Sequence, residues 1–219
     1  MIRGGVYHVI SRFTAKEWFV ESSVERRGYL SLLGTEIAKT DSRCFAFAIM
    51  SSHVHLGLVA GAKPLAKWLR PMHTTFAQWI NERRGRIGGV FVKGPKVVAY
   101  QPAGTERLIN YIHHNPVRAG IVASPSDSDW TSHRMYLGLD QCPTWLDVEC
   151  GVALTRFDDR SGLAAWIEST TIQRRDLDAF RLVPYRRPGR PPKMRNPPEQ
   201  EAGFDFVAGA GFEPATFGL

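Results

Sequence analysis

The sequence predicts an α+β fold of the ferredoxin-like (split βαβ) type, in which helices pack on an antiparallel sheet. Two observations predict it. The chain has 219 residues, which suits one domain with appendages. Stretches with the two-residue period of strands and the 3.6-residue period of helices follow in the order strand, helix, strand, strand, helix, strand, helix. The first six elements of that order are the split βαβ pattern.

The first two elements are a strand at residues 5–13 and a helix that begins near Ser22 or Ser23. "GVYHVISRF" alternates and is rich in β-branched and aromatic residues, as strands are. Either serine is a preferred N-cap for the helix that follows. Its apolar residues at helical spacing are Leu30, Leu33 and Ile37.

The next two elements are strands joined as a hairpin. Residues 44–50, "CFAFAIM", are wholly apolar, which is typical of a buried central strand. The turn at Ser51-Ser52 has two residues, the commonest hairpin length. In the following stretch, "HVHLGLV", alternation puts His53 and His55 on one face of the strand, with Gly57. The other face is apolar and predicts core residues at Val54, Leu56 and Leu58.

Two helices and one strand region complete the pattern. A helix is expected over 64–83, where Pro64 suits the first turn and Leu65, Leu69, Met72, Phe76 and Ile80 keep the helical period. "GGVFVKGPKVVAY" reads as a strand pair or one bulged strand. The stretch "GTERLINYIHHNPVRAG" predicts a third helix with Thr105 as its cap and Gly120 as its stop.

Three regions are expected along the chain. Residues 1–130 hold the principal domain, and residues 131–184 a small accessory region of loops and short helices. Residues 185–219 begin with "YRRPGRPPKMRNPP", which is proline-rich and basic and cannot build a core. The composition of this tail favours a disordered basic segment. An AT-hook is the alternative, although Pro188 stands where an AT-hook has an arginine.

The last residues differ from the rest of the chain. "GFEP" within "GAGFEPATFGL" can be encoded by GGG TTC GAA CCC, which resembles the T-arm of a transfer RNA gene. We interpret this end as a reading frame that continues into a neighbouring gene.

Charge is unevenly distributed. Residues 1–120 hold 17 basic and 7 acidic side chains (+10), and residues 185–198 hold 5 basic and none acidic (+5). The overall charge is +7. A polyanion such as nucleic acid is the natural partner of such a surface, and plain solubility is the alternative. No apolar stretch is long enough to span a membrane, no secretory leader is visible, and the three cysteines form no C-x-x-C. We therefore expect a cytoplasmic protein, and a nucleic-acid partner would make it nucleoid-associated.

The paired histidines are the first candidate site. Two imidazoles on one strand face could bind a metal, yet no Cys or carboxylate lies near enough in sequence to complete a zinc site. Tyr111 and Asn115 are four residues apart and share one helix face, at the margin of the apolar stripe. An amphipathic tyrosine at the edge of the core is the alternative. Pro116 is expected to bend the helix beside Asn115.

Four motifs resemble the REP-associated branch of the IS200-like single-tyrosine transposases. "MSSHVHL" resembles their M-P-N-H-V-H-L segment, "YIHHNPVRAGIV" their tyrosine helix, "DWTSHRMYLG" a downstream stretch and "YHVISR" their first strand. These motifs occur in the family's order and cover residues 5–140. In this chain Ser51-Ser52 replaces Pro-Asn, and Gly57 stands where a bulky apolar residue is usual. The family is of the HUH endonuclease type, with a ferredoxin-like fold.

The resemblance implies a reaction on DNA. His53 and His55 would bind one divalent metal, Mg or Mn, with Asn115 as third ligand. Tyr111 would be the nucleophile and would form a 5′-phosphotyrosine. A phenol in water has a pKa of about 10, so its deprotonation needs assistance. The substrate would be single-stranded or hairpin DNA of the REP type, with no small-molecule substrate and no membrane, and the protein a monomer or homodimer.

Candidate phosphate contacts are the basic residues near these motifs and in the tail, namely Arg12, Lys93, Lys96, Arg118, Arg187 and Arg190. His113 and His114 beside the tyrosine could touch phosphate or act as a base, although a surface position is the favoured reading. Two other functions stay open. One is a non-catalytic single-stranded nucleic-acid-binding module of ferredoxin-like fold. The other is a zinc-dependent hydrolase, which lacks a carboxylate base near the histidines.

Overall fold

A five-stranded antiparallel sheet with the strand order β2-β3-β1-β4-β5 forms the centre of the protein. The computed structural model describes residues 2–92 and 94–182. The strands are β1 (Val6–Arg12), β2 (Arg43–Met50), β3 (His53–Val59), β4 (Lys96–Tyr100) and β5 (Arg181–Leu182).

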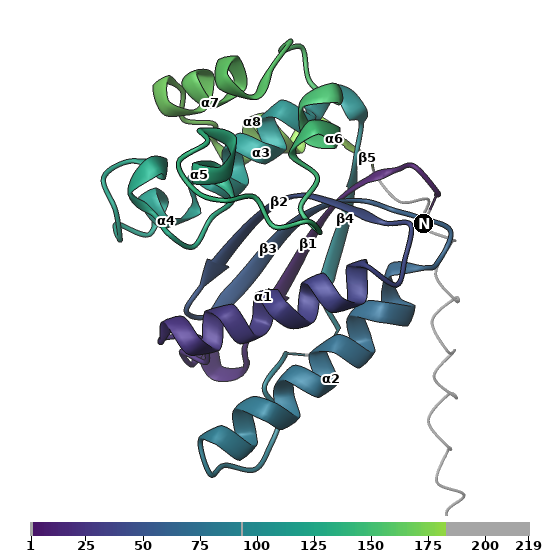
Figure 1. Cartoon of the computed structure of the whole chain (residues 1–219), viewed down its shortest axis with the longest axis vertical. Helices are drawn as coiled ribbons and strands as arrows, with labels where there is room; N and C mark the ends of the chain where they lie inside the picture. Colours follow the sequence, from purple (N-terminus) through teal and green to yellow (C-terminus); the bar gives the residue numbers. More distant parts are fainter. Residues whose placement is uncertain (1, 93, 183–219) are drawn as a thin grey trace, which may run out of the picture. The chain divides into compact units, whose positions relative to one another are not determined.

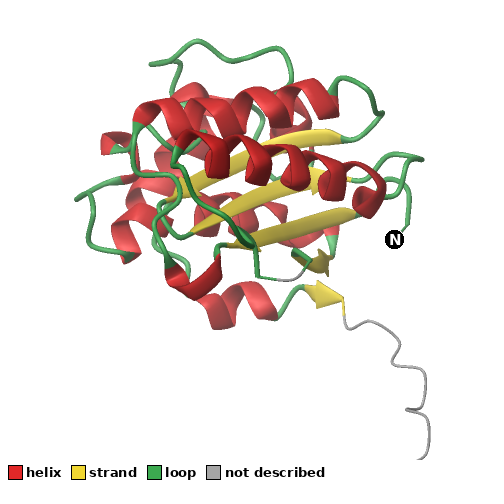
Figure 2. Ribbon diagram, turned by 90° about the horizontal axis from the view of Figure 1, so that it is seen from below, coloured by secondary structure: helices red, strands yellow, loops and turns green. Residues whose placement is uncertain are grey.

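Helices cover both faces of this sheet (Figure 1). α1 and α2 lie against one face, and α3 and α6 lie against the other; Figure 2 shows the sheet with helices packed over it. The helices are α1 (Ser23–Ile37), α2 (Leu65–Arg83), α3 (Thr105–His113), α4 (Asn115–Arg118), α5 (His133–Tyr136), α6 (Val148–Ala153), α7 (Arg160–Ser169) and α8 (Arg174–Asp178), with short 3₁₀ turns at Thr14–Lys16, Pro102–Gly104 and Pro125–Asp127.

The predicted ferredoxin-like order is confirmed. β1, α1, β2, β3, α2 and β4 follow one another along the chain, and β1 lies between β3 and β4 in the sheet. β5, from the late part of the chain, adds a short strand beyond β4, with Ala99 paired to Leu182. None of the helices among the described residues is long and apolar enough to cross a bilayer.

Local signals place the first two helices as expected. Ser22 caps α1: its Oγ accepts from the Glu25 backbone N–H at 3.3 Å, and the Glu25 carboxylate accepts from the Ser22 N–H at 2.9 Å. This reciprocal pair is a capping box, which satisfies two backbone donors at the helix start. Pro64 caps α2, whose five periodic apolar residues are all buried.

The prediction that residues 44–50 form a central strand is wrong. β2 lies at the edge of the sheet order, although almost all of its residues are buried. Its free edge is covered by loop residues: the Ile49 N–H donates to Trp130 O at 2.8 Å, and the Asp147 N–H donates to Cys44 O at 2.7 Å. A covered edge strand has the same apolar sequence pattern as a central strand, because neither its faces nor its edge is exposed to water.

Gly57 makes room for a neighbouring ring. A Cβ at this position would lie 2.5 Å from the ring of Phe45. The bulky side chain expected at position 57 from the family pattern is therefore replaced by an aromatic ring from β2. The departure at Gly57 leaves the sheet packed.

Two other local predictions are wrong. Among the described residues of the strand region before the third helix, β4 is the only strand, while Phe91 makes an isolated bridge to Phe13. The cap of α3 is Gly104, because Thr105 is already helical and its hydroxyl donates to Pro102 O at 2.7 Å. The stop at Gly120 is confirmed, with a left-handed φ of +68° that glycine adopts without strain.

Residues beyond 130 share the same hydrophobic core as the strands. Their buried apolar side chains belong to one cluster with those of β1–β4, and include Tyr136, Leu146, Val152, Leu163 and Ile167. Residues 185–219, with the basic tail and the T-arm-like end, lie outside the described residues.

Candidate active site

The two histidines of β3 lie side by side on the sheet face that α3 covers. The ring centroids of His53 and His55 are 4.8 Å apart. The side chain of His55 is 4% exposed, whereas His53 is half-buried. The apolar residues of the opposite face are fully buried, namely Val54, Leu56 and Leu58. The predicted alternation is therefore confirmed.

Side chains brace the turn before His53. Arg26 of α1 donates from Nη2 to Ser51 Oγ at 3.3 Å, and its guanidinium lies 4.9 Å from the ring centre of Trp130. Ser52 Oγ lies 3.1 Å from Nδ1 of His53. Although this chain lacks the Pro-Asn of the family pattern, two hydroxyls fix the turn and the first histidine.

The third predicted helix is interrupted beside Asn115, as its proline predicts. α3 ends at His113 and α4 begins at Asn115. Pro116 has no N–H to donate to the helix. The Asn115 amide compensates, because its Nδ2 donates to Tyr111 O at 2.8 Å and to Ile112 O at 3.2 Å. Both amide hydrogens are thus used, which leaves the Asn115 side-chain oxygen for the pocket that this residue lines.

Tyr111 stands edge-on to the imidazoles. Its ring centroid lies 6.2 Å from that of His55, with an interplanar angle of 80°. The Arg118 guanidinium lies 4.4 Å from the centre of the Tyr111 ring and donates to Tyr111 O at 2.8 Å. A guanidinium near an aromatic ring is attracted to its π electrons. The phenol ring is therefore held by histidines and by a cation.

One pocket of about 700 Å³ brings four predicted site residues together. They are His53, His55, Tyr111 and Asn115. Arg12, the ladder partner of His53, lies at the same pocket. This volume is in the range of ligand-binding pockets. No Asp or Glu is among the described residues that line it.

The other basic residues predicted to contact phosphate differ in how near they lie to this pocket. Lys96 lines a small adjoining cavity with Tyr111. Arg118 also donates to the backbone carbonyl of Ile172, so its guanidinium is engaged with the protein. Lys93, Arg187 and Arg190 lie outside the described residues.

The donor atoms at this pocket fit a divalent cation. Among the described residues, Nε2 of His55 is buried and has no hydrogen-bond partner, which is rare in folded proteins. Ser52 occupies Nδ1 of His53, which leaves Nε2 of that ring. Burial lowers the pKa of His53 and His55, and nearby positive groups lower both further, so both rings are neutral at pH 7 and offer lone pairs.

A third ligand for such a cation would have to be of another type. Across residues 2–92 and 94–182, no three His, Cys, Asp or Glu side chains are grouped so that they could hold a metal ion. The Asn115 amide oxygen could supply a hard donor instead, since this residue lines the pocket. Two imidazole nitrogens and one amide oxygen, completed by water or phosphate oxygens, suit Mn²⁺ or Mg²⁺.

A third histidine at this site escaped the sequence analysis. Nε2 of His8, on β1, lies 2.8 Å from Nδ1 of His55. Burial lowers the pKa of His8 to about 3, so its ring is neutral. The available signal was the alternation of "YHVISR", which puts His8 on one face with Arg12. The pairing of β1 with β3 was needed to bring that face to His55.

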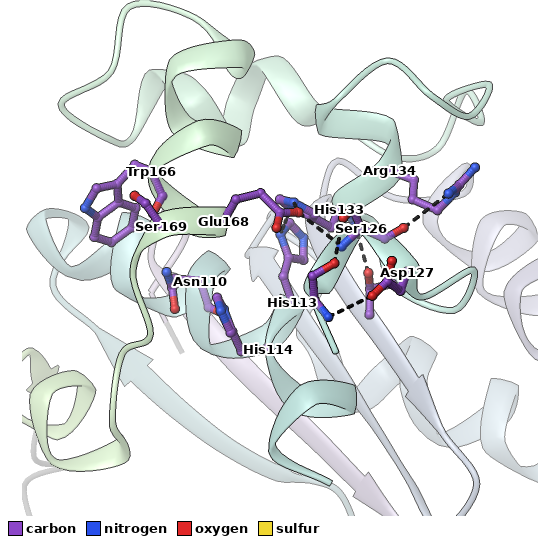
Figure 3. A network of polar contacts seen from close by, with 12 residues as sticks. Asn110, His113, His114, Ser126, Asp127, His133, Arg134, Trp166, Glu168 and Ser169 are labelled. Carbon is purple, nitrogen blue, oxygen red and sulfur yellow. Dashed lines mark hydrogen bonds and ion pairs between the residues drawn. The ribbon is translucent and has the colours of Figure 1, made fainter. Parts of the chain in front are cut away.

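A second group of histidines anchors the tyrosine helix to the accessory region (Figure 3). We call Glu168, His133, His113 and Ser132 the anchor chain. His133 Nε2 lies 2.8 Å from the Glu168 carboxylate, and His133 Nδ1 lies 3.1 Å from His113 Nδ1. His113 Nε2 lies 2.8 Å from Ser132 Oγ, which accepts from the Phe47 N–H at 3.0 Å. The chain joins α7, α5, α3 and β2.

The anchor chain allows one assignment of its protons when both rings are neutral. Burial lowers the pKa of His113 and of His133, so both are neutral at pH 7. His133 then donates from Nε2 to Glu168, His113 donates from Nδ1 to His133, and Ser132 donates to His113. Every ring nitrogen of His113 and His133 has a partner, which indicates a structural role.

The favoured surface position of His113 and His114 is wrong. Both rings are buried, and His114 Nδ1 bonds to Asn110 O at 3.1 Å. Their neighbours explain this, since Glu168 and His133 come from distant segments that cover α3. Neither ring lines the pocket that Tyr111 lines.

Residues 170–172 clasp the same helix. Asn110 Nδ2 donates to Thr170 O at 2.6 Å, and the Ile172 N–H donates to Asn110 Oδ1 at 3.2 Å. This clasp brings α8 to the site, where Arg174 lines the pocket with Tyr111. Arg174 is a second residue that the sequence analysis missed, because the contact spans about sixty residues of chain.

The fold of this chain is similar to that of a solved protein. A REP-associated tyrosine transposase, determined bound to a REP hairpin, matches 67% of this chain and 90% of its own, with 14% identity and a TM-score of 0.54. The chain has the fold of that transposase. A protein provisionally named a transposase, from Deinococcus radiodurans R1, matches 55% of this chain and 88% of its own, with 15% identity and a TM-score of 0.39.

Comparison by sequence gives no further relatives. No protein-family model matches the chain, and no curated protein matches it. At 14% identity, the similarity to the solved transposase lies in the order and pairing of the helices and strands. The sequence motifs contain His53, His55, Tyr111 and Asn115, and these four residues line the pocket.

Proposed function

We propose that this chain is a single-strand DNA transposase of the IS200-like, REP-associated type, which cuts and joins hairpin DNA through a 5′-phosphotyrosine. The observation that carries the proposal is the single pocket that contains Tyr111, His53, His55 and Asn115. The shared fold with a REP-hairpin-bound transposase supports it. The four motifs, found in the family's order, support it independently of the fold.

Tyr111 is the proposed nucleophile. Its phenolic oxygen forms a bond to phosphorus while the bond from phosphorus to the 3′ oxygen breaks, which leaves a 5′-phosphotyrosine and a free 3′-OH. The new ester keeps the energy of the original phosphodiester, so a second 3′-OH can attack it and rejoin the strand. No nucleotide cofactor is needed for either step.

His53, His55 and Asn115 would hold one Mg or Mn ion. The bound ion would supply Lewis-acid polarisation of the scissile phosphate. The neutral ligands leave the full ionic charge available to an anionic substrate. Among the described pocket residues all charged side chains are basic, which favours a phosphodiester further.

Basic side chains would hold the DNA backbone on either side of the cut. Arg12 and Arg174 line the pocket, and Lys96 lies in the adjoining cavity. Lys93, Arg187 and Arg190 stay candidates from the sequence, as does Arg118, whose guanidinium also braces Tyr111. Contacts of this kind make binding fall as salt rises.

The two alternative functions fit the geometry less well. A nucleic-acid-binding module of the RRM type presents aromatic side chains on an open sheet face, whereas helices cover both faces of this sheet. A zinc-dependent hydrolase needs a carboxylate base, and none lines the described part of the pocket.

The test is a labelled hairpin oligonucleotide with a single-stranded extension, incubated with Mn²⁺ and the full chain. We expect a protein–DNA adduct that survives a denaturing gel. Tyr111→Phe should bind the hairpin without forming the adduct, and Tyr7→Phe, outside the pocket, should behave as the unaltered chain. Binding without any adduct by the unaltered chain would favour the non-catalytic module.

A further inference from the structure

His55 has one nitrogen in use and one without a partner. Nδ1 lies 2.8 Å from His8 Nε2, whereas Nε2 is buried and has no hydrogen-bond partner in residues 2–92 and 94–182. A ring nitrogen binds a cation through its lone pair, so Nε2 must be free of hydrogen. The ring proton then sits on Nδ1, and its acceptor is Nε2 of His8.

The sheet holds His8 where it can accept this proton. Ile10 of β1 is the ladder partner of His55, so His8 is the diagonal neighbour of His55 on the same face. The ring centroids lie 5.0 Å apart and the ring planes are inclined by only 26°, which suits a hydrogen bond between the two ring edges. Because the side chain of His8 is only 2% exposed, water does not compete freely for the contact.

His8 also touches the proposed nucleophile. The Tyr111 ring stands edge-on to His8, with centroids 5.9 Å apart and an interplanar angle of 74°. The same ring stands edge-on to His55. A single side chain of β1 therefore packs against both a proposed metal ligand and the phenol.

We propose that His8 is a positioning residue that fixes the tautomer and orientation of His55 and so tunes the affinity of the pocket for a divalent cation. This inference rests on the proposed function. Outer hydrogen-bond partners of metal-ligating histidines commonly act in this way, and their loss reduces metal affinity by about 10–100-fold. His8 itself would not be a ligand, because its Nε2 accepts from His55 and the Nδ1 of the neutral ring then carries the proton.

The first test measures Mn²⁺ binding to the full chain by the loss of the free-ion EPR signal, without DNA. His8→Leu should weaken binding about 10–100-fold. His8→Gln, which can place an amide oxygen near the position of Nε2, should restore most of the affinity. The matched control is His73→Leu: His73 is also buried, and bonds to Ser11 and Tyr29 away from this pocket.

The second test needs no variant of His8 that folds. Long-range ¹H–¹⁵N correlation spectra of the unaltered protein should show His55 protonated on Nδ1 and His8 bare on Nε2. A proton on Nε2 of His55 would overturn the proposal. So would a folded His8→Leu protein that binds Mn²⁺ as tightly as the unaltered chain.

A further variant separates this inference from the proposed function. His53→Ala should abolish the tight Mn²⁺ site in the unaltered background. If it does, and His8→Leu has no effect, then only the role of His8 fails. If His53→Ala binds Mn²⁺ as tightly as the unaltered chain, the proposed metal site is wrong, and the proposed role of His8 is wrong with it.

Discussion

The protein contains two histidine clusters on the same face of one sheet, and they differ in how their nitrogens are satisfied. In the anchor chain, every polar atom of His113 and His133 has a partner, and the chain ends on the Glu168 carboxylate. In the pocket, the hydrogen-bonded pair of His8 and His55 ends on a buried nitrogen, Nε2 of His55, that has no partner in the part of the protein that the structure describes. Burial alone therefore does not distinguish a structural histidine from a proposed metal ligand. What distinguishes them is whether the nitrogen at the end of the hydrogen-bonded series has a partner.

The two histidine clusters also differ in what they do for helix α3. The anchor chain and the clasp at Asn110 hold α3 against the accessory region. The pocket receives Tyr111 and Asn115 from the same helix region. A rigid helix is required if the phenol is to stay at a fixed distance from two imidazoles.

The largest expected effect is the loss of DNA cleavage in the His55→Ala variant of the pocket. Because this change removes a proposed ligand of the ion, we expect Mn²⁺-dependent cleavage of a hairpin oligonucleotide to fall by about 10³-fold, equal to several kcal/mol of transition-state stabilisation. Single-turnover gel assays measure the rate. Cleavage within tenfold of the unaltered chain would remove His55 from the chemistry.

The anchor chain should respond in stability. His113→Ala opens a cavity and leaves Ser132 and His133 without a partner, so we expect a loss of about 2–4 kcal/mol in the free energy of unfolding. Urea denaturation followed by circular dichroism measures this. His55→Ala should lose less stability, because it leaves one partner, His8, unpaired instead of two and removes a nitrogen that has no partner among the described residues. An equal loss in both variants would erase the distinction between the clusters.

Acid should destabilise the fold. Burial holds the pKa of His113 well below its ordinary value of 6.5, and lowers that of His133. Below pH 6.5 the unfolded chain therefore binds more protons than the folded one, and stability falls as pH falls toward the folded-state pKa values. Each ring that stays neutral contributes a slope of about 1.4 kcal/mol per pH unit.

Urea midpoints between pH 7.5 and 5 check this slope. Stability should be nearly flat above pH 7 and should fall below 6.5. The His113→Ala variant should have a shallower dependence, since one neutral ring is gone. A variant slope as steep as that of the unaltered chain would show that His113 does not titrate as described.

The smallest expected effect is at the turn. Ser52→Ala removes the hydroxyl that lies 3.1 Å from Nδ1 of His53. Loss of one hydrogen bond of about 1 kcal/mol should weaken Mn²⁺ binding roughly fivefold. Ser31→Ala, on the outer side of α1, serves as the surface control. Unchanged affinity in Ser52→Ala would mean that the turn does not orient His53.

The sequence was sufficient for features that depend on local pattern. The alternation around His53 and His55, the hairpin turn and the interruption at Pro116 follow from periods and from proline chemistry. They involve residues within a few positions of each other. The motif resemblance then named Tyr111 and Asn115, and the fold places both at the pocket.

Features that depend on distant partners were missed. His8 was overlooked because its role requires β1 to pair beside β3. His113 and His114 were expected at the surface because Glu168 and His133, which cover them, lie 19–55 residues further along the chain. β2 was expected at the centre of the sheet because the loops that cover its edge carry no local signal.

The most direct test of the account is the identity of the residue that carries DNA. The adduct formed with a hairpin oligonucleotide and Mn²⁺ would be digested with trypsin and nuclease and analysed by mass spectrometry. We predict a 5′-nucleotide on Tyr111, in the peptide spanning residues 108–118. A nucleotide on any other residue, or a cleaved strand without a protein adduct, would contradict the account.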